Sequence, residues 1–316
     1  MELLGMHHLT AVTAHASENL KFYTNVLGMR LVKKTVNQDD VSAYHLFYAD
    51  KLGTPGTDIT FFDWAHAGKR TGETDGILRT FLSVPSVASL HFWKERLSGF
   101  GVQVGEVVKL GSRSSLFFED AEGQRIGLVS AEGAELQGEV WDAEVPATHA
   151  IRGLYGVELA VPELIQIEGI LVHVLGMVKQ ESYESVEVPG EMVSVFSMGE
   201  GGAGREVHVV ERKGQRMVAL AGGVHHVAFR VGSGGELLQQ WAERLNFVRM
   251  PNSGLVDRFY FKSLYFRISD GILFELATDD PGFASDEDAD HLGEKLALPP
   301  FLEDRRTEIE AGLKAL

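Results

Sequence analysis

The chain has 316 residues, of which 44% are hydrophobic and 23% are charged, as in ordinary globular proteins. This length suits two domains of about 150 residues each. A formal charge of −16, from 45 acidic against 29 basic residues, argues against nucleic acid and anionic membrane surfaces as partners. Without cysteine, the chain forms neither disulfides nor thiolate ligands, so His, Asp or Glu must hold any transition metal.

No basic segment followed by a long apolar run opens the sequence, and no stretch of about 18 apolar residues occurs in it. The absence of cysteine also fits a reducing compartment. We therefore expect a cytoplasmic protein with no membrane span.

Four segments of the chain share one plan. Each opens with a strand-like run, and these runs lie at 7–13 (HHLTAVT), 78–84 (LRTFLSV), 154–161 (LYGVELAV) and 225–231 (HHVAFRV). An amphipathic helical stretch follows each run. Three β-like runs come next, which in the first segment lie at 29–36, 43–49 and 58–64 and in the last at 247–250, 258–268 and 272–278. Each segment is thus predicted to be a β-α-β-β-β unit.

The helices of these units end in similar ways. Gly28, Gly99 and Gly176 can take the left-handed conformation that caps a helix in the first three units. Asn246 can do so in the fourth.

One such unit buries only one face of its sheet well, so we expect the units to pair. The predicted fold class is α+β, with four units paired into two cup-shaped mixed-sheet domains. An N-terminal half, 1–140, would hold unit one (1–70) and unit two (71–140). A C-terminal half, 141–316, would hold unit three (150–215), unit four (220–280) and a closing helix from about Glu303. The stretch 131–151 is the best candidate for a linker between the halves.

The His-His pairs that open units one and four are candidate metal ligands. Strand alternation places His225, with Val227, on the face toward the helix, and His226 on the opposite face, where a curved sheet encloses a cavity. The same parity places His8 and Thr10 on the cavity face of unit one.

A carboxylate for the same site is available in the last strand-like run. Glu275 stands in the middle of an otherwise apolar stretch, ILFELAT, where an unpaired charge is costly. His8, His226 and Glu275 would then form the two-histidine, one-carboxylate set of non-haem Fe(II) oxygenases. Other histidines, His45 among them, have no carboxylate at a matching position and are interpreted as structural.

The pattern resembles the vicinal oxygen chelate superfamily of glyoxalases, extradiol dioxygenases and drug-resistance binders. Within it, the chain is similar over nearly its whole length to the four-module dioxygenases that cleave hydroquinone rings. The segments that carry this resemblance are HHLTAVT, KKTVNQDD, YHLFYAD, LGTPGTDITFF, GVHHVAFRV, FELATDDPGF and DEDADHLG.

By motif position, the resemblance implies that His8, His226 and Glu275 bind Fe(II). It also implies catalytic outer-shell residues, which are His7, Thr10, His225, Arg258 and Tyr265. Because units two and three offer Arg79 and Gly156 in place of histidine, units one and four are expected to form the metal cup.

The expected reaction is the opening of a hydroquinone- or catechol-type diol with O2, with Mn(II) as an alternative metal. In this scheme His7 or His225 exchanges protons, Tyr265 donates a hydrogen bond to the ligated oxygen, and Arg258 stabilises negative charge. The ring substituents and the choice between para- and ortho-diols stay open. A homodimer is one expected assembly.

Two other functions fit the same residues. A glyoxalase-like isomerase or lyase would use the metal as a Lewis acid, typically with a fourth protein ligand, and would consume no O2. A metal-free protein that binds an aromatic drug or quinone would contain no stoichiometric iron, but it would leave Glu275 buried without a cation.

Overall fold

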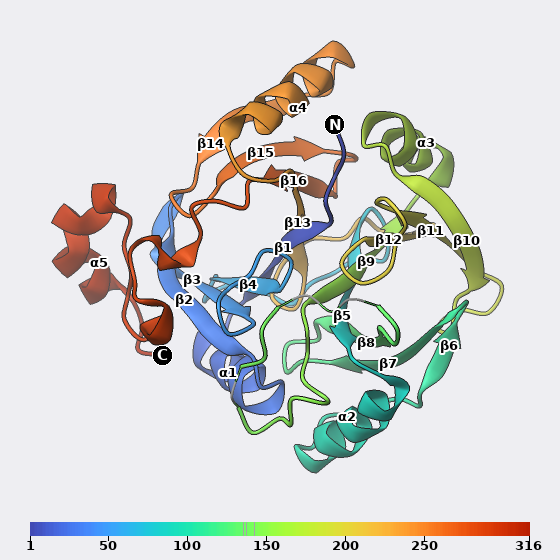
Figure 1. Ribbon diagram of the computed structural model, residues 1–316, viewed down its shortest axis with the longest axis horizontal. Coiled ribbons are helices and arrows are strands. Elements are labelled where there is room, and N and C mark those ends of the chain that lie inside the picture. The colour runs from blue at the N-terminus through green and yellow to red at the C-terminus, as the bar shows by residue number, and fades with distance from the viewer. Residues whose placement is uncertain (135, 137, 142) are drawn as a thin grey trace.

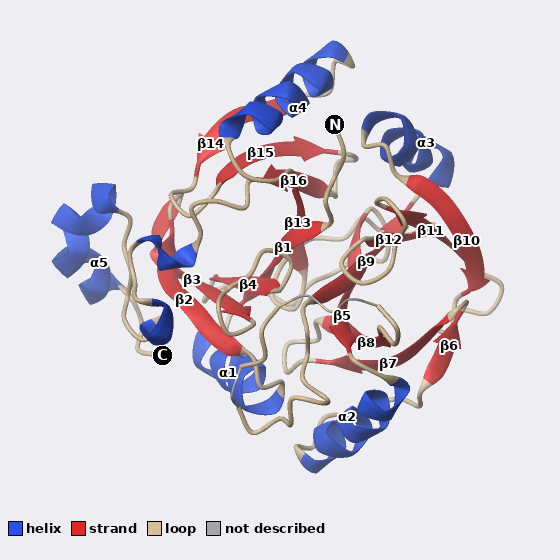
Figure 2. Ribbon diagram, in the orientation of Figure 1, coloured by secondary structure: helices blue, strands red, loops and turns tan. Residues whose placement is uncertain are grey.

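The computed structural model describes residues 1–134, 136, 138–141 and 143–316. It contains two curled, eight-stranded mixed sheets with helices packed on their outer sides (Figures 1 and 2). The predicted α+β fold, with four β-α-β-β-β units paired into two cups, is confirmed. None of the described helices is long and apolar enough to cross a membrane.

The first sheet combines unit one with unit four, in the order β14-β15-β16-β13-β1-β4-β3-β2. Unit one supplies β1 (Met6–Thr13), β2 (Arg30–Asn37), β3 (Asp40–Ala49) and β4 (Asp58–Asp63). Unit four supplies β13 (Val224–Arg230), β14 (Asn252–Asp257), β15 (Lys262–Arg267) and β16 (Leu273–Ala277). The two units join through the antiparallel pair β1–β13. Within each unit the first and last strands are parallel neighbours.

The second sheet combines units two and three in the same way, in the order β10-β11-β12-β9-β5-β8-β7-β6. Its strands are β5 (Gly76–Val84), β6 (Val108–Leu110), β7 (Arg113–Glu119), β8 (Arg125–Ser130), β9 (Leu154–Val161), β10 (Val178–Glu184), β11 (Met192–Ser197) and β12 (Glu206–Glu211). Here the units join through the antiparallel pair β5–β9. Each sheet therefore unites segments that are far apart in the sequence (Figure 1).

The helices cover the sheets from outside and bury large apolar side chains there. They are α1 (Ala16–Lys21), which continues as a π-helical turn (Phe22–Val26), α2 (Val87–Gly99), α3 (Leu164–Gly169), with a π-helical turn (Ile170–Val174), and α4 (Gly235–Phe247). Trp93 and Trp241 occupy matching places on α2 and α4 and are almost completely buried. The interior of each cup is thus separated from the main apolar core, which lies between the sheets and the helices.

The C-terminal segment packs against β2 and β3. It contains short 3-10 turns at Phe283–Ser285, Ala289–His291 and Pro300–Arg305, followed by α5 (Arg306–Gly312). Leu298, Leu302 and Ile309 form an apolar cluster with Val36 of β2. Leu296 also forms a parallel bridge to Lys34, so this segment covers the outer edge of the first sheet.

Three expectations about unit ends were wrong. The run 247–250 is not a strand, because α4 continues to Phe247 and the strand begins five residues later, at Asn252. Gly99 is the last residue of α2, and Gly101 takes the left-handed conformation instead, at φ 76°. Asn246 lies inside α4. The positive φ after this helix belongs instead to Arg249, two residues beyond its last residue.

The predicted linker runs along unit one. Residues 135, 137 and 142 of that stretch lie outside the described residues. The backbone N–H of Glu139 donates to the Asp50 carboxylate at 2.7 Å, and Val145 and Ala150 are buried in the main core. The described part of this connection therefore packs against the body of the protein.

Candidate metal centre

Three buried side chains from the first sheet converge on one point. The antiparallel pair β1–β13 places Thr10 opposite His226 and His8 opposite Ala228, so the two histidines approach each other across the strand boundary. Glu275 lies on β16 directly beside Ala228. Their exposed fractions are 2% for His8, 4% for His226 and 0% for Glu275.

The facing atoms of the three side chains lie close together. Glu275 Oε2 lies 3.0 Å from His226 Nε2 and 3.3 Å from His8 Nε2, and the two Nε2 atoms are 3.4 Å apart. Within the described part of the chain, no fourth His, Asp or Glu joins this group. The three residues implied by the sequence are therefore brought together.

The hydrogen bonds around His8 determine which nitrogen carries its proton. His7 Nε2 lies 3.1 Å from the carbonyl oxygen of Thr278, which can only accept, so this nitrogen must be protonated. Burial, and then the neighbouring His8, lowers the pKa of His7 to about 3, so His7 is neutral and its Nδ1 is an acceptor. That Nδ1 lies 2.9 Å from His8 Nδ1. His8 therefore donates from Nδ1, which leaves Nε2 as the nitrogen whose lone pair would bind a metal.

His225 and His226 repeat this arrangement. Their Nδ1 atoms are 2.7 Å apart, and burial, followed by the neighbouring His226, lowers the pKa of His225 to about 3. If His226 ligates through Nε2, its Nδ1–H donates to His225, and the proton of His225 then lies on Nε2. His225 lines the cavity, whereas His7 is buried against Thr278.

The predicted orientation of His225 is wrong. Simple alternation placed it with Val227 on the helix side, but it lies beside Phe62 and Trp64 in the cavity. The register of the β1–β13 pair is irregular at two places. Thr10 pairs with His226 but Ala11 pairs with Val224, so His225 is skipped, and a second shift lies between Met6 and His8. Such bulges redirect side chains, which allows the two rings of each pair to contact each other.

Glu275 is held by one neutral donor. Ser263 Oγ, on β15, donates to Glu275 Oε1 at 2.5 Å. The other oxygen, Oε2, has no hydrogen-bond donor of its own among the described residues and faces the two imidazoles. Burial raises the pKa of Glu275, but His8 and His226 outweigh burial and keep that pKa well below its usual range. The carboxylate is thus ionised, and its Oε2 faces the Nε2 atoms of both histidines, which supply the balancing positive charge when no metal ion lies between them.

This donor set fits a divalent metal ion. An ionised carboxylate and two imidazole lone pairs repel one another unless a cation lies between them. Ligands about 2.1 Å from a metal, at right angles to one another, are about 3 Å apart, close to the 3.0–3.4 Å seen here. The paired histidines fix the ligand tautomers, as outer-shell partners of metal sites commonly do.

A cavity of about 340 Å³ opens in front of the two histidine ligands, His8 and His226. Most of its wall is aromatic or apolar, from Val36, Phe47, Phe62, Trp64, Tyr260, Phe261, Tyr265 and Leu273. A pocket of this size and lining suits a small aromatic molecule.

Two more of the side chains implied by the resemblance, Arg258 and Tyr265, stand in the cavity wall. Arg258 Nε donates to the Tyr265 hydroxyl at 3.2 Å, and both terminal nitrogens of Arg258 pair with Asp39 at 3.1 and 2.9 Å. Burial, and then Glu275, raises the pKa of Tyr265 far above its usual value, so its hydroxyl keeps its proton as a donor. The Tyr265 ring lies edge-on to His226.

Thr10 acts through a neighbour. Its hydroxyl lies 2.8 Å from that of Thr60, which in turn lies 2.9 Å from His45 Nε2. His45, which was interpreted as structural, lines the cavity. Strand alternation could have indicated this position, because it places His45 and Phe47 on one face of β3.

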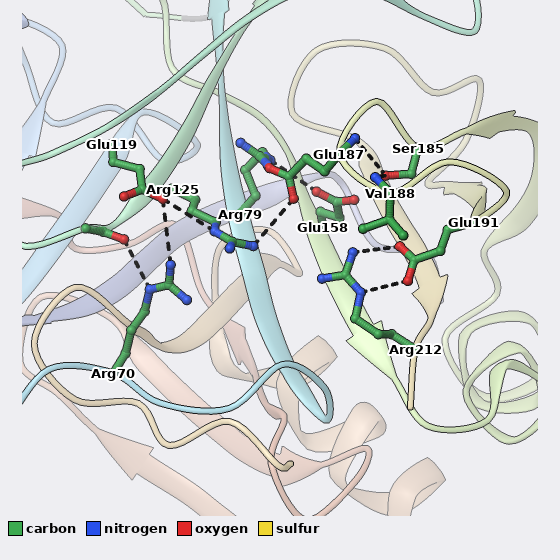
Figure 3. A network of polar contacts seen from close by, with 11 residues as sticks. Arg70, Arg79, Glu119, Arg125, Glu158, Ser185, Glu187, Val188, Glu191 and Arg212 are labelled. Carbon is green, nitrogen blue, oxygen red and sulfur yellow. Dashed lines mark hydrogen bonds and ion pairs between the residues drawn. The ribbon is translucent and has the colours of Figure 1, made fainter. Parts of the chain in front are cut away.

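The equivalent centre of the second cup is filled by ion pairs (Figure 3). Arg79, at the place that His8 holds in unit one, pairs with Glu187 and, at 3.2 Å, with Glu158. Arg125 extends this network to Glu187 and Glu119, each at 3.5 Å. With its charges already paired, this cup offers no metal-ligand cluster within the residues that the structure describes.

Comparisons with known proteins agree with the fold. The model of the Glyoxalase/Bleomycin resistance protein/Dioxygenase superfamily matches residues 5–128. The chain is 45% identical, across 100% of both chains, to the proposed ring-cleaving dioxygenase MhqA of Bacillus subtilis. It is 29% identical to a chlorohydroquinone/hydroquinone 1,2-dioxygenase of Sphingobium indicum, over 96% of this chain and 94% of that protein.

Solved structures give the same result. A proposed dioxygenase from Bacillus subtilis superposes with a TM-score of 0.89 at 34% identity, covering 100% of this chain and 98% of that one. Glyoxalase I from Zea mays has a TM-score of 0.63 at 15% identity, covering 87% of this chain and 92% of that one. At this low identity, the second likeness concerns the fold alone.

Proposed function

Because the chain belongs to the Glyoxalase/Bleomycin resistance protein/Dioxygenase superfamily, and is an oxygenase within it, we propose that it opens a hydroquinone- or catechol-type aromatic diol with O2 at an Fe(II) ion. The observation that carries this proposal is the cluster of His8, His226 and Glu275. Three ligands on one side of a metal leave positions open for small molecules, as in two-histidine, one-carboxylate oxygenases. Mn(II) suits the same ligands.

The internal symmetry of the first sheet supports an open coordination position. Thr60 lies beside Thr10 on β4 just as Glu275 lies beside Ala228 on β16. Thr60 therefore occupies in unit one the place that the carboxylate ligand occupies in unit four. A threonine hydroxyl is a poor ligand beside carboxylate and imidazole. This feature favours a dioxygenase over an isomerase whose metal is closed by a fourth protein ligand.

When bound, Fe(II) would lower the pKa of a diol hydroxyl and supply the one-electron chemistry that O2 requires. The chain's own residues bind and orient the ring. The aromatic wall packs against its faces, and His225 Nε2–H and the Tyr265 hydroxyl are donors at the cavity surface. Arg258 places a positive charge beside Tyr265 that would stabilise negative charge on the ring oxygens.

Of the two histidines expected to exchange protons, His225 fits better. It lines the cavity, whereas Nε2 of His7 is occupied by the carbonyl of Thr278. We assign His7 the role of orienting His8, and Thr10 the role of orienting Thr60. Activity in the cytoplasm and a homodimeric assembly are proposals that rest on the sequence alone.

The metal-free binding protein is disfavoured by Glu275. Its side chain is fully buried, and without a metal ion its charge would be balanced only by buried protonated histidines, which would lower the stability of a protein that never bound a cation.

The decisive experiment follows O2 consumption. Protein reconstituted with Fe(II) under nitrogen is mixed with hydroquinones or catechols in an oxygen electrode. We expect steady O2 uptake by the wild type and its loss in Glu275→Gln, because an amide is a far weaker ligand than a carboxylate. Glu158→Gln, which alters a buried carboxylate of the second cup, is the control and should stay active. Turnover of the diol without O2 uptake would instead identify an isomerase.

A further inference from the structure

His45 is a polar side chain in an otherwise mainly aromatic part of the cavity wall. It stands on β3, packed between the rings of Phe47 and Phe62 at centroid distances of 4.0 and 4.4 Å. Its Nε2 lies 2.9 Å from the Thr60 hydroxyl. Two ring contacts and one hydrogen bond therefore fix the plane and the rotation of this imidazole.

The second ring nitrogen of His45 is free to bind a ligand. Nδ1 has no hydrogen-bond partner among the residues that the structure describes, although the side chain lines the cavity. Burial, and then the nearby His8, His226 and Arg258, lowers the pKa of His45 well below its usual value, while Glu275 raises it. His45 is therefore neutral, with one donor and one acceptor nitrogen.

The hydroxyls behind His45 allow either nitrogen to be the donor. If Thr60 donates to His45 Nε2, then Nδ1 carries the proton and points a donor into the cavity. If His45 Nε2 donates to Thr60, then Thr60 donates to Thr10, and Nδ1 is an acceptor. Nδ1 of His45 can therefore form a hydrogen bond with a hydroxyl either as the donor or as the acceptor.

His45 stands apart from the three ligands in the wall of the same cavity. β3 lies two strands away from β1 in the first sheet, which is roughly 10 Å at the backbone. His45 is not a member of the ligand cluster, but it lines the same cavity as His8 and His226. An ortho hydroxyl would stay beside the ligands, whereas a para hydroxyl would point away from them.

We propose that His45 Nδ1 hydrogen-bonds the hydroxyl para to the one held at the metal centre, so that His45 selects para-diols. This inference rests on the proposed function and deepens it. It makes His45 a substrate-contacting residue, with Thr60 as the residue that positions it.

The test removes the imidazole and the substrate hydroxyl in turn. Fe(II)-loaded protein is titrated under nitrogen with hydroquinone, phenol and catechol in a calorimeter, which gives three dissociation constants without turnover. His45→Phe keeps the ring packing but loses the hydrogen bond. We expect its affinity for hydroquinone to fall about tenfold, the usual loss for one neutral hydrogen bond. Its affinity for phenol and catechol, and its iron content, should stay within about twofold of the wild type.

His149→Phe is the matched control. His149 also stacks on a phenylalanine, Phe92, and its Nδ1 lies 3.2 Å from a hydroxyl, that of Ser89, but it is not among the residues that line this cavity. This variant should bind all three probes as the wild type does. Thr60→Val provides a second test if His45→Phe does not fold, and it should weaken hydroquinone binding alone, by a smaller factor.

Two results would overturn the inference. One is an equal loss of hydroquinone and phenol affinity in His45→Phe, or in Thr60→Val where His45→Phe does not fold. The other is a larger loss for catechol than for hydroquinone. A wild-type protein that binds none of the three probes would contradict the proposed function itself. Binding to the wild type is therefore measured before any variant is compared.

Discussion

Each imidazole that faces the metal centre is oriented by the histidine preceding it in the chain. His7 is held by the backbone carbonyl of Thr278 and in turn contacts His8 through the Nδ1 atoms of the two rings. His225 contacts His226 through the same two atoms. Ser263 holds Glu275 in a comparable way. The ligand geometry thus depends on residues that never touch the metal, as is common in metal sites.

Ser263→Ala tests this dependence for the carboxylate. Losing the hydrogen bond to Oε1 should lower the affinity for Fe(II) about tenfold, measured by competition with a chelator, because Glu275 is then free to rotate. Ser194→Ala, at a buried serine of the second sheet, should leave the affinity unchanged. Wild-type affinity in Ser263→Ala would show that the surrounding packing alone orients the carboxylate.

Asp120 gives a pH dependence of stability that is independent of the metal centre. Burial, only partly offset by hydrogen bonds from the backbone N–H groups of Gln124 and Glu122, raises its pKa to about 6. The hydroxyl of Tyr23 also donates to this carboxylate, at 3.2 Å. Because the folded-state pKa lies above the unfolded value, the folded protein loses stability as pH rises from about 4 to 6.

Asp120→Asn should remove this loss. Relative to the wild type, the variant should gain up to about 3 kcal/mol of unfolding free energy between pH 4 and pH 7, since one pKa unit corresponds to about 1.4 kcal/mol. Urea unfolding at both pH values measures the difference, with the exposed Asp304→Asn as control. A constant difference between Asp120→Asn and the wild type would contradict a raised pKa.

At the level of elements, regular patterns were predictable and irregular ones were not. The three strands that follow α1 were expected close to where β2, β3 and β4 lie, because their apolar runs end at clear turn residues. β14 was misplaced because its alternating exposed residues, NSGLVD, carry little hydrophobic signal. The β-bulges that turn His7 and His225 toward their partners depend on cross-strand register, which a single sequence does not contain.

The opening strand of each unit decides what its cup can do. On β5, Arg79 replaces a ligand histidine and is stabilised by the carboxylates of Glu158 and Glu187. The side chains of Arg79 and Glu158 are only 4% and 10% exposed. Removing one partner therefore leaves an uncompensated buried charge.

Arg79→Leu should lower the free energy of unfolding by about 3 kcal/mol, as observed when a buried ion pair is broken. The double variant Arg79→Leu/Glu158→Leu should recover most of this loss, because the more buried carboxylate is then removed as well and Glu187 still has Arg125 as a partner. Chemical denaturation measures both, and Fe(II) affinity should be unchanged in folded protein. A loss of Fe(II) binding in Arg79→Leu would show that the second cup contributes to the metal centre.

At the scale of the whole molecule, the four repeated units account for the fold. A single apolar core runs through both sheets and includes Leu9 of β1, Leu82 of β5, Leu159 of β9 and Val227 of β13. The repeat made this fold predictable, since one unit cannot bury both faces of its sheet. The convergence of ligands from the first and fourth units follows from the β1–β13 pairing. The cavity wall was less predictable, because the resemblance assigns no role to His45 or Trp64, which line it.

The central claim is that His8, His226 and Glu275 hold one divalent metal ion, and metal analysis tests it most directly. Protein loaded with Fe(II) or Mn(II) under nitrogen, and then freed of unbound metal, should contain one ion per chain. The same treatment should leave Glu275→Gln without metal and Glu158→Gln with one ion. A wild-type chain that retains no metal, or a Glu275→Gln chain that retains a full equivalent, would contradict the account.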